Sequence, residues 1–259
     1  MNQQVTPPRP DISVWLTQAL RLTVFPTPQA QIGSVAWWSG LTGVEPETRI
    51  SQPRIATLQE EGPFQGGVLT LKIEPLRIEW LLGKSTETLA EEDTLPVLGR
   101  LIETLPEFKA LMTRWLAVPD VPPVNRLALG AVLLQPVDTR QEGYRRLSSY
   151  LRAVHVDPET SSDFFYQINR RRPSRTGVAN LNINRLSKWS SSLAMRRMIV
   201  AGPGGVSIAA AQEFHACRLE LDINTAPEFP GPLPNEIRAG LLDEFVDLSL
   251  EIAREGDIP

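Results

Sequence analysis

Two acidic side chains that alternate along one segment are the first candidates for chemistry in this sequence. Glu220 and Asp222 are separated by one residue in the stretch CRLELDIN, so an extended strand would place both carboxylates on one face. Carboxylates on adjacent strands, together with a lysine, are a common way for nucleases to hold Mg²⁺. The Glu-x-Lys triplet at residues 107–109 lies in a segment with the spacing of an amphipathic helix, so the strand context for such a site is missing. A metal-dependent nuclease is therefore an alternative function, and the solvated face of an edge strand is the simpler explanation of both carboxylates.

Other arrangements of catalytic or metal-binding residues are sparse. The sequence has two histidines, His155 and His215, and one thiol, Cys217. His215 and Cys217 would share one face of a strand, but a zinc site needs at least three ligands. No G-x-S-x-G motif is present, and the GPGG run at residues 202–205 lacks a following Lys-Ser or Lys-Thr. We therefore predict no catalytic residues, no metal site and no cofactor.

A basic segment is the main charge feature of the chain. Residues 164–212 contain no Asp or Glu, although the whole chain has a net charge of −4. If strands flank the turn at residues 173–177, arginines of neighbouring strands lie side by side, which is destabilising unless an anionic group covers them. We call this segment the basic meander. Its candidate binding residues are Arg170, Arg171, Arg172, Arg175, Arg185, Lys188, Arg196 and Arg197.

Three interpretations of the basic meander are open. It could bind the phosphates of a nucleic acid, with Asn169, Asn182 and Asn184 as further donors and Tyr166 or Trp189 stacking on bases. It could dock an acidic protein partner or the acidic part of a second copy. The acidic segments ETLAEED and DEFVD could also fold against it and satisfy its charges internally. The sequence pI of about 5.4 is unlike that of most nucleic-acid binders, which favours the last two interpretations.

The composition is that of an ordinary globular protein. Of the 259 residues, 42% are hydrophobic and 22% are charged. A single cysteine excludes an intramolecular disulfide and is typical of a reducing compartment. No apolar run approaches the roughly 18 residues that cross a bilayer, and the N-terminal stretch MNQQVTPPRP lacks the apolar core of a signal peptide. We expect a cytoplasmic protein with no membrane association, and a homo-oligomer is compatible with the sequence.

Hydrophobic periodicity predicts two long helices and several strands. Residues 93–118 have helical spacing, with Thr94 as N-cap, Pro96 in the first turn and Pro106 at a kink or break. Residues 233–256 form the second helix, which ends at Gly256. Strict alternation at residues 66–83 predicts an antiparallel hairpin. Further strands are predicted at residues 13–25, 125–137, 163–171, 180–190, 194–200 and 216–224, and shorter helices at residues 32–43 and 140–154.

The order of these elements suggests an internal repeat. A strand, a short helix, an antiparallel meander and a long amphipathic helix occur twice, with a proline-rich break at residues 119–123. We therefore predict an α+β fold class with two similar halves of the β-α-β-β-α type, in which each antiparallel sheet is covered by its own long amphipathic helix. The predicted domains are residues 1–120 and residues 121–259, packed as one unit.

Several stretches of the chain resemble a known group of sequences. These are LTLKIEPLRIEW, VNRLALGAVLLQPV, INRLSKW, and CRLELDINT followed by LPNEIRAGLLDEFVDLSLEI. Together they resemble a sporadically distributed family of uncharacterised prokaryotic proteins of about this size, over residues 15–252. The resemblance provides no catalytic residues, and the scattered distribution implies an accessory role in a defence or mobile-element system. The expected function is a non-enzymatic binding protein that engages an anionic partner, either an acidic protein surface or a nucleic acid.

Overall fold

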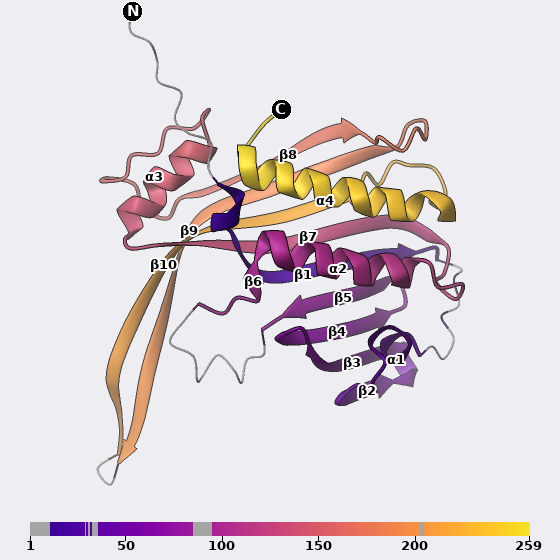
Figure 1. Cartoon of the computed structure of the whole chain (residues 1–259), viewed down its shortest axis with the longest axis horizontal. Coiled ribbons are helices and arrows are strands. Elements are labelled where there is room, and N and C mark those ends of the chain that lie inside the picture. Colours follow the sequence, from indigo (N-terminus) through magenta and orange to yellow (C-terminus); the bar gives the residue numbers. More distant parts are fainter. Residues whose placement is uncertain (1–10, 29, 31, 33–35, 85–94, 203–204) are drawn as a thin grey trace, which may run out of the picture.

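The computed structural model describes residues 11–28, 30, 32, 36–84, 95–202 and 205–259, with backbone alone at residues 194–202 and 205–212. Ten strands form one antiparallel sheet in the order β2-β3-β4-β5-β1-β7-β10-β9-β8, and β6 pairs with β1 beside this path (Figure 1). The strands are β1 (Leu16–Pro26), β2 (Thr48–Gln52), β3 (Thr57–Phe64), β4 (Gly67–Glu74), β5 (Arg77–Gly83), β6 (Gly99–Arg100), β7 (Val124–Val137), β8 (Phe165–Pro173), β9 (Asn182–Gly202) and β10 (Gly205–Thr225). The helices are α1 (Trp37–Thr42), α2 (Leu101–Leu116), α3 (Arg140–Tyr150) and α4 (Arg238–Glu255), with short 3-10 turns at Ile12–Val14, Pro53–Ile55 and Asn235–Ile237.

The helices α2 and α4 lie side by side across one face of the sheet (Figure 1). Alternation along the strands explains this arrangement. In β5, Ile78, Trp80 and Leu82 are buried beneath the helices, whereas Leu81 is exposed on the other side. We call the side opposite α2 and α4 the open face of the sheet.

The hydrophobic core lies between the sheet and the two long helices. Its largest members are the fully buried tryptophans, whose rings contact one another and Tyr150 of α3. Trp80 of β5 meets Trp115 of α2 edge to face at 5.9 Å between ring centroids. Trp15 lies 6.1 Å from Trp189 of β9. Large aromatic side chains therefore bridge the sheet and the helices along most of the molecule.

The predicted fold class is wrong. The chain is mainly β, and the two predicted halves contribute to one continuous sheet rather than to two sheets that each have a covering helix. Strands β1 and β7 pair along their length at the centre of the sheet, and α2 contacts α4 directly. The physical reason is that period-two alternation reports which face of a strand is buried, but not which strand lies beside it. The division into residues 1–120 and 121–259 stays a prediction.

Several predicted boundaries also change. Helix α2 begins at Leu101, after a short pairing of β6 with β1, so Pro96 precedes the helix and Thr94 lies outside the described residues. Pro106 lies inside a single helix, so the predicted alternative of two separate helices is wrong. The predicted strands at 180–190 and 194–200 form the one strand β9. Gly256 caps α4, as predicted.

None of the described helices is long and apolar enough to cross a membrane.

Candidate functional site

The arginines of β8 that point toward the helices have carboxylate partners in the C-terminal part of the chain. Arg170 donates two hydrogen bonds to Asp257, from Nε at 3.0 Å and from Nη2 at 2.9 Å. Arg172 donates to both carboxylate oxygens of Glu251 in α4, at 3.1 and 3.2 Å. Such paired guanidinium–carboxylate contacts are strong and specific in geometry. The C-terminal part of the chain thus neutralises this side of the basic meander.

The turn after β8 is fixed in the same way. The Arg175 guanidinium donates to Asp247 at 2.8 Å, and its backbone N–H donates to the buried carboxylate of Glu244 at 3.0 Å. Glu244 also accepts a hydrogen bond from the Ser174 hydroxyl at 2.7 Å. Helix α4 therefore supplies the acidic groups that hold this turn.

Two cations of the basic meander lie on the open face, and they are paired as well. Arg171 donates to Glu228 at 3.0 and 3.2 Å. The Lys188 Nζ lies 3.7 Å from an oxygen of Glu220 on the neighbouring strand. Their side chains are partly exposed, so these pairs contribute little to stability.

Arg185 is the buried cation of the basic meander, with 1% of its side chain exposed. Its Nη2 lies 4.0 Å from Glu251 and donates to the backbone oxygen of Ile258 at 3.4 Å. The side chains of Arg196 and Arg197 lie outside the described residues. Each described cation of the basic meander therefore has a carboxylate of the same chain beside it.

The contact of Asp257 with the basic meander makes the stability of the folded chain depend on pH. The hydrogen bonds from Arg170 lower the pKa of Asp257 below its ordinary value, and the hydroxyl of Tyr166 adds a third, at 2.7 Å. A lowered carboxyl pKa stabilises the folded state above the unfolded pKa of about 3.9, and this contribution is lost as pH falls through the folded pKa. We expect Asp257→Asn to cost about 1–2 kcal/mol at neutral pH and much less in acid.

Urea unfolding of the wild-type chain and of Asp257→Asn, across the pH range below neutrality, measures this difference. The exposed position Asp243, where Asp243→Asn removes a surface pair with Lys109, serves as the control. If the free energies of unfolding of the wild-type chain and of Asp257→Asn differed by the same amount from neutral pH to acid, the assigned role of Asp257 would be contradicted.

The carboxylates considered for a nuclease do lie on one face of β10, the open face. Glu220 accepts a hydrogen bond from Arg218 at 2.9 Å and pairs with Lys188, whereas Asp222 accepts one from the Asn224 amide at 2.9 Å. Within the described residues, no group of three or more His, Cys, Asp or Glu side chains could hold a metal ion. These contacts give the two carboxylates different roles, because Glu220 is neutralised by cations and Asp222 is not.

The thiol considered with His215 is part of the core. Cys217 is buried, and its Sγ donates to the backbone oxygen of Gly143 in α3 at 3.2 Å. Burial raises the pKa of this thiol to about 12, so it stays protonated at neutral pH. A protonated thiol is a poor metal ligand.

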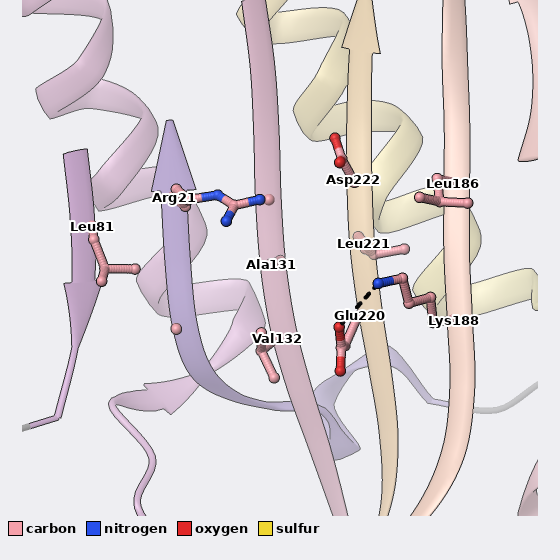
Figure 2. A pocket seen from close by; sticks show the side chains of 11 residues that line it. Arg21, Leu81, Ala131, Val132, Leu186, Lys188, Glu220, Leu221 and Asp222 are labelled. Carbon is pink, nitrogen blue, oxygen red and sulfur yellow. Dashed lines mark ion pairs between the residues drawn. The ribbon is translucent and has the colours of Figure 1, made fainter. Parts of the chain in front are cut away.

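The structure has a groove on the open face that the sequence did not predict. Two adjoining pockets, of about 150 and 240 Å³, share Arg21 and Asp222. Their floor is strand β7, whose Ala128, Gly130 and Val132 are short between the longer side chains of β1 and β10. Figure 2 shows the larger pocket, with Arg21 extending across β7 from one side and Asp222 and Glu220 on the other. We call the two pockets together the open-face groove; its lining residues are Ala19, Arg21, Thr23, Phe25, Arg77, Leu81, Arg126, Ala128, Gly130, Ala131, Val132, Leu186, Lys188, Glu220, Leu221, Asp222 and Asn224.

Arg21 is the central cation of the open-face groove. It is half-buried, and its guanidinium has no hydrogen bond or ion pair with any described residue. Its side chain lies directly over Gly130: a methyl group added to this glycine would be 3.3 Å from both Nε and Nη2 of Arg21. A glycine at this point of β7 is what allows the guanidinium to lie flat along the floor.

Arg126 is the second cation of the groove without a carboxylate partner in the described part of the chain. Its guanidinium lies 5.1 Å from the centre of the Phe25 ring and donates to the Asn224 side chain at 3.2 Å. Arg77, by contrast, pairs with Glu79. Two arginines of the groove thus retain donors that no carboxylate neutralises.

The groove could not be predicted from the sequence, because no motif links the residues that line it. Arg21 lies in an ordinary strand, far along the chain from the basic meander. Only the pairing of β1 with β7 and of β7 with β10 brings Arg21, Gly130 and Asp222 into one row. A glycine inside an otherwise apolar strand was the single visible hint of a close approach.

Comparison with known proteins gives no relative: no family model, no curated protein and no solved structure matches the chain.

Proposed function

We propose that this chain is a non-enzymatic binding protein that engages an anionic partner through the open-face groove. The observation that carries the proposal is the state of Arg21. The described cations of the basic meander are paired within the chain, whereas Arg21 lies unpaired on the floor of a groove. An unpaired, half-buried guanidinium over small residues is a ready donor to a carboxylate or a phosphate.

Among anionic partners, the groove favours an acidic polypeptide over a nucleic acid. Asp222, which no described cation neutralises, lines the same groove as Arg21 and would repel the continuous charge of a phosphate backbone, whereas a polypeptide can place a neutral or basic side chain beside it. The aromatic residues considered for base stacking are engaged elsewhere, because Trp189 is fully buried and the Tyr166 hydroxyl donates to Asp257. Mixed charges in one groove are typical of protein recognition, where they fix the register of the partner.

The setting in the cell is part of the same proposal. We propose a cytoplasmic protein, because a single buried cysteine is typical of a reducing compartment. An accessory role in a prokaryotic defence or mobile-element system rests on the sequence resemblance alone.

Arg21→Ala is the direct test. We expect this change to weaken binding of a fluorescein-labelled polyglutamate peptide by about 10- to 100-fold, because a hydrogen bond to a charged group contributes roughly 1.5–3 kcal/mol. Fluorescence anisotropy at low ionic strength measures the affinity. Arg145→Ala, which removes an exposed arginine on helix α3, changes the net charge equally and is expected to leave binding unchanged.

A labelled single-stranded oligonucleotide in the same assay separates the two partner classes. Tighter binding of the oligonucleotide than of the peptide, lost in Arg21→Ala, would replace the polypeptide partner by a nucleic acid. Equal binding by the wild-type chain and Arg21→Ala would remove the open-face groove from the function altogether.

A further inference from the structure

Opposite charges face each other across the open-face groove without touching. Arg21 and Asp222 are both in register with Gly130, on the strands to either side of it. Adjacent strands are about 4.8 Å apart, so the two backbones are separated by roughly 10 Å. No ion pair joins Arg21 and Asp222, although both side chains line the same pockets (Figure 2). The groove therefore holds a cationic group over its floor at Gly130 and an anionic group on β10, and these two groups are not paired with each other.

The Asp222 carboxylate is oriented by a neighbouring amide and can accept further hydrogen bonds. Its Oδ1 accepts a hydrogen bond from the Asn224 amide at 2.9 Å, and Asn224 in turn accepts from the Asn184 amide at 3.1 Å. No described cation lies within ion-pairing distance of Asp222, whereas the neighbouring Glu220 has both Arg218 and Lys188. Asp222 is thus oriented by amides, which leave its negative charge in place.

Gly130 leaves room on the floor of the groove for the Arg21 guanidinium. A methyl group at this position would lie 3.3 Å from Nε and Nη2 of Arg21, so the guanidinium would have to shift by a few tenths of an ångström. With glycine there, the Arg21 side chain reaches across β7 toward the strand that carries Asp222 (Figure 2). This gives the site two charged groups of opposite sign, unpaired within the described chain, beside the same position of β7.

We propose that the open-face groove binds a polypeptide segment that carries an acidic and a basic side chain close together, with the carboxylate on Arg21 and the ammonium or guanidinium group on Asp222. The inference rests on the proposed function and specifies its partner. A segment with only acidic side chains would satisfy Arg21 and leave Asp222 beside a like charge. A segment with both charges pairs with both Arg21 and Asp222, which is the electrostatic complementarity expected of a specific interface.

Two labelled peptides of equal length and equal glutamate content test this partner, one a Glu-Lys repeat and the other a Glu-Gly repeat. We expect Asp222→Asn to weaken binding of the Glu-Lys peptide about ten-fold, because a charge-assisted contact is lost. The same variant is expected to bind the Glu-Gly peptide as well as the wild-type chain or better, since a repulsive charge is removed. Arg21→Ala is expected to weaken binding of both peptides.

The control is Glu107→Gln on the exposed side of α2, which makes the same chemical change away from the groove. Thermal unfolding of each variant checks that the fold is retained. Unchanged Glu-Lys binding in Asp222→Asn, with binding still lost in Arg21→Ala, would overturn this inference and leave the proposed function standing. If Arg21→Ala bound both peptides as tightly as the wild-type chain, the proposed function itself would fail.

Discussion

Replacing Trp15 by alanine is expected to lower the free energy of unfolding by about 3–5 kcal/mol. The Trp15 side chain is fully buried and contacts the rings of Tyr150 and Trp189, at 5.4 and 6.1 Å between centroids. Truncation would leave a cavity where the start of β1, helix α3 and strand β9 meet. Because the side chains around this space are closely packed, they can relax into it only in part.

The indole of Trp15 also satisfies a helix terminus. Its Nε1 donates at 2.8 Å to the backbone oxygen of Ala253, in the last turn of α4. Carbonyls in this turn have no partner within the helix, and the N–H of Asp257 that would reach Ala253 donates to Tyr150 instead. Trp15→Phe keeps most of the buried surface and loses this hydrogen bond, so it is expected to cost about 1–2 kcal/mol.

Urea unfolding of the wild-type chain, Trp15→Phe and Trp15→Ala measures the two contributions separately. The control is Ile102→Ala on α2, which also truncates an apolar side chain, but one that is 41% exposed. The control is expected to cost less than about 1 kcal/mol. A Trp15→Ala variant no less stable than Ile102→Ala would mean that Trp15 does not join these elements in the folded chain.

The elements that the sequence predicted well are those with one buried face. In β4 and β5, buried Leu71 and Trp80 alternate with partly exposed neighbours, and in α2 and α4 the apolar stripe faces the sheet. By contrast, β2 and β3 were not predicted. All five residues of β2 are exposed, and β3 buries few side chains, so neither strand has an apolar alternation that sequence reasoning could detect.

The arrangement of the strands could not be predicted, because it depends on long-range pairing. Strand β7 is apolar along most of its length, which is consistent with a central strand but does not identify its neighbours. Its pairing with β1 on one side and β10 on the other merges the two predicted halves into one sheet. The same pairing creates the open-face groove, so the site was hidden for the same reason as the fold.

The charges of the basic meander were visible in the sequence, but their partners were not. Arg170, Arg171 and Arg172 are consecutive, yet their carboxylates come from three different places near the C-terminal end of the described chain. Alternation along β8 directs Arg171 to the open face and its two neighbours toward α4. A cluster of like charges in sequence is therefore separated in the fold into individual ion pairs.

Gly256→Ala is expected to destabilise the chain by about 2–4 kcal/mol and to detach Asp257 from Arg170. Gly256 has φ of +82° and ψ of −150°, a conformation that residues with a side chain rarely adopt. A Cβ atom at this position would lie 2.0 Å from the carbonyl oxygen of Tyr150, which accepts a hydrogen bond from the Asp257 N–H at 3.1 Å. Both the backbone conformation and the contact with Tyr150 therefore require glycine.

Gly240→Ala is the matched control, because it makes the same change within α4 where no atom lies within 4 Å of the added methyl group. It is expected to raise stability by about 0.5–1 kcal/mol, since alanine is the better helix former. Urea unfolding gives the stability of both variants, and the pH dependence of Gly256→Ala shows whether Asp257 still titrates with a lowered pKa. Because loss of the Asp257 contacts removes the acid-sensitive part of the stability, Gly256→Ala should follow the pH profile of Asp257→Asn. A wild-type pH profile in Gly256→Ala would contradict this prediction, because it would mean that Asp257 keeps its contact with Arg170 after the glycine has been replaced.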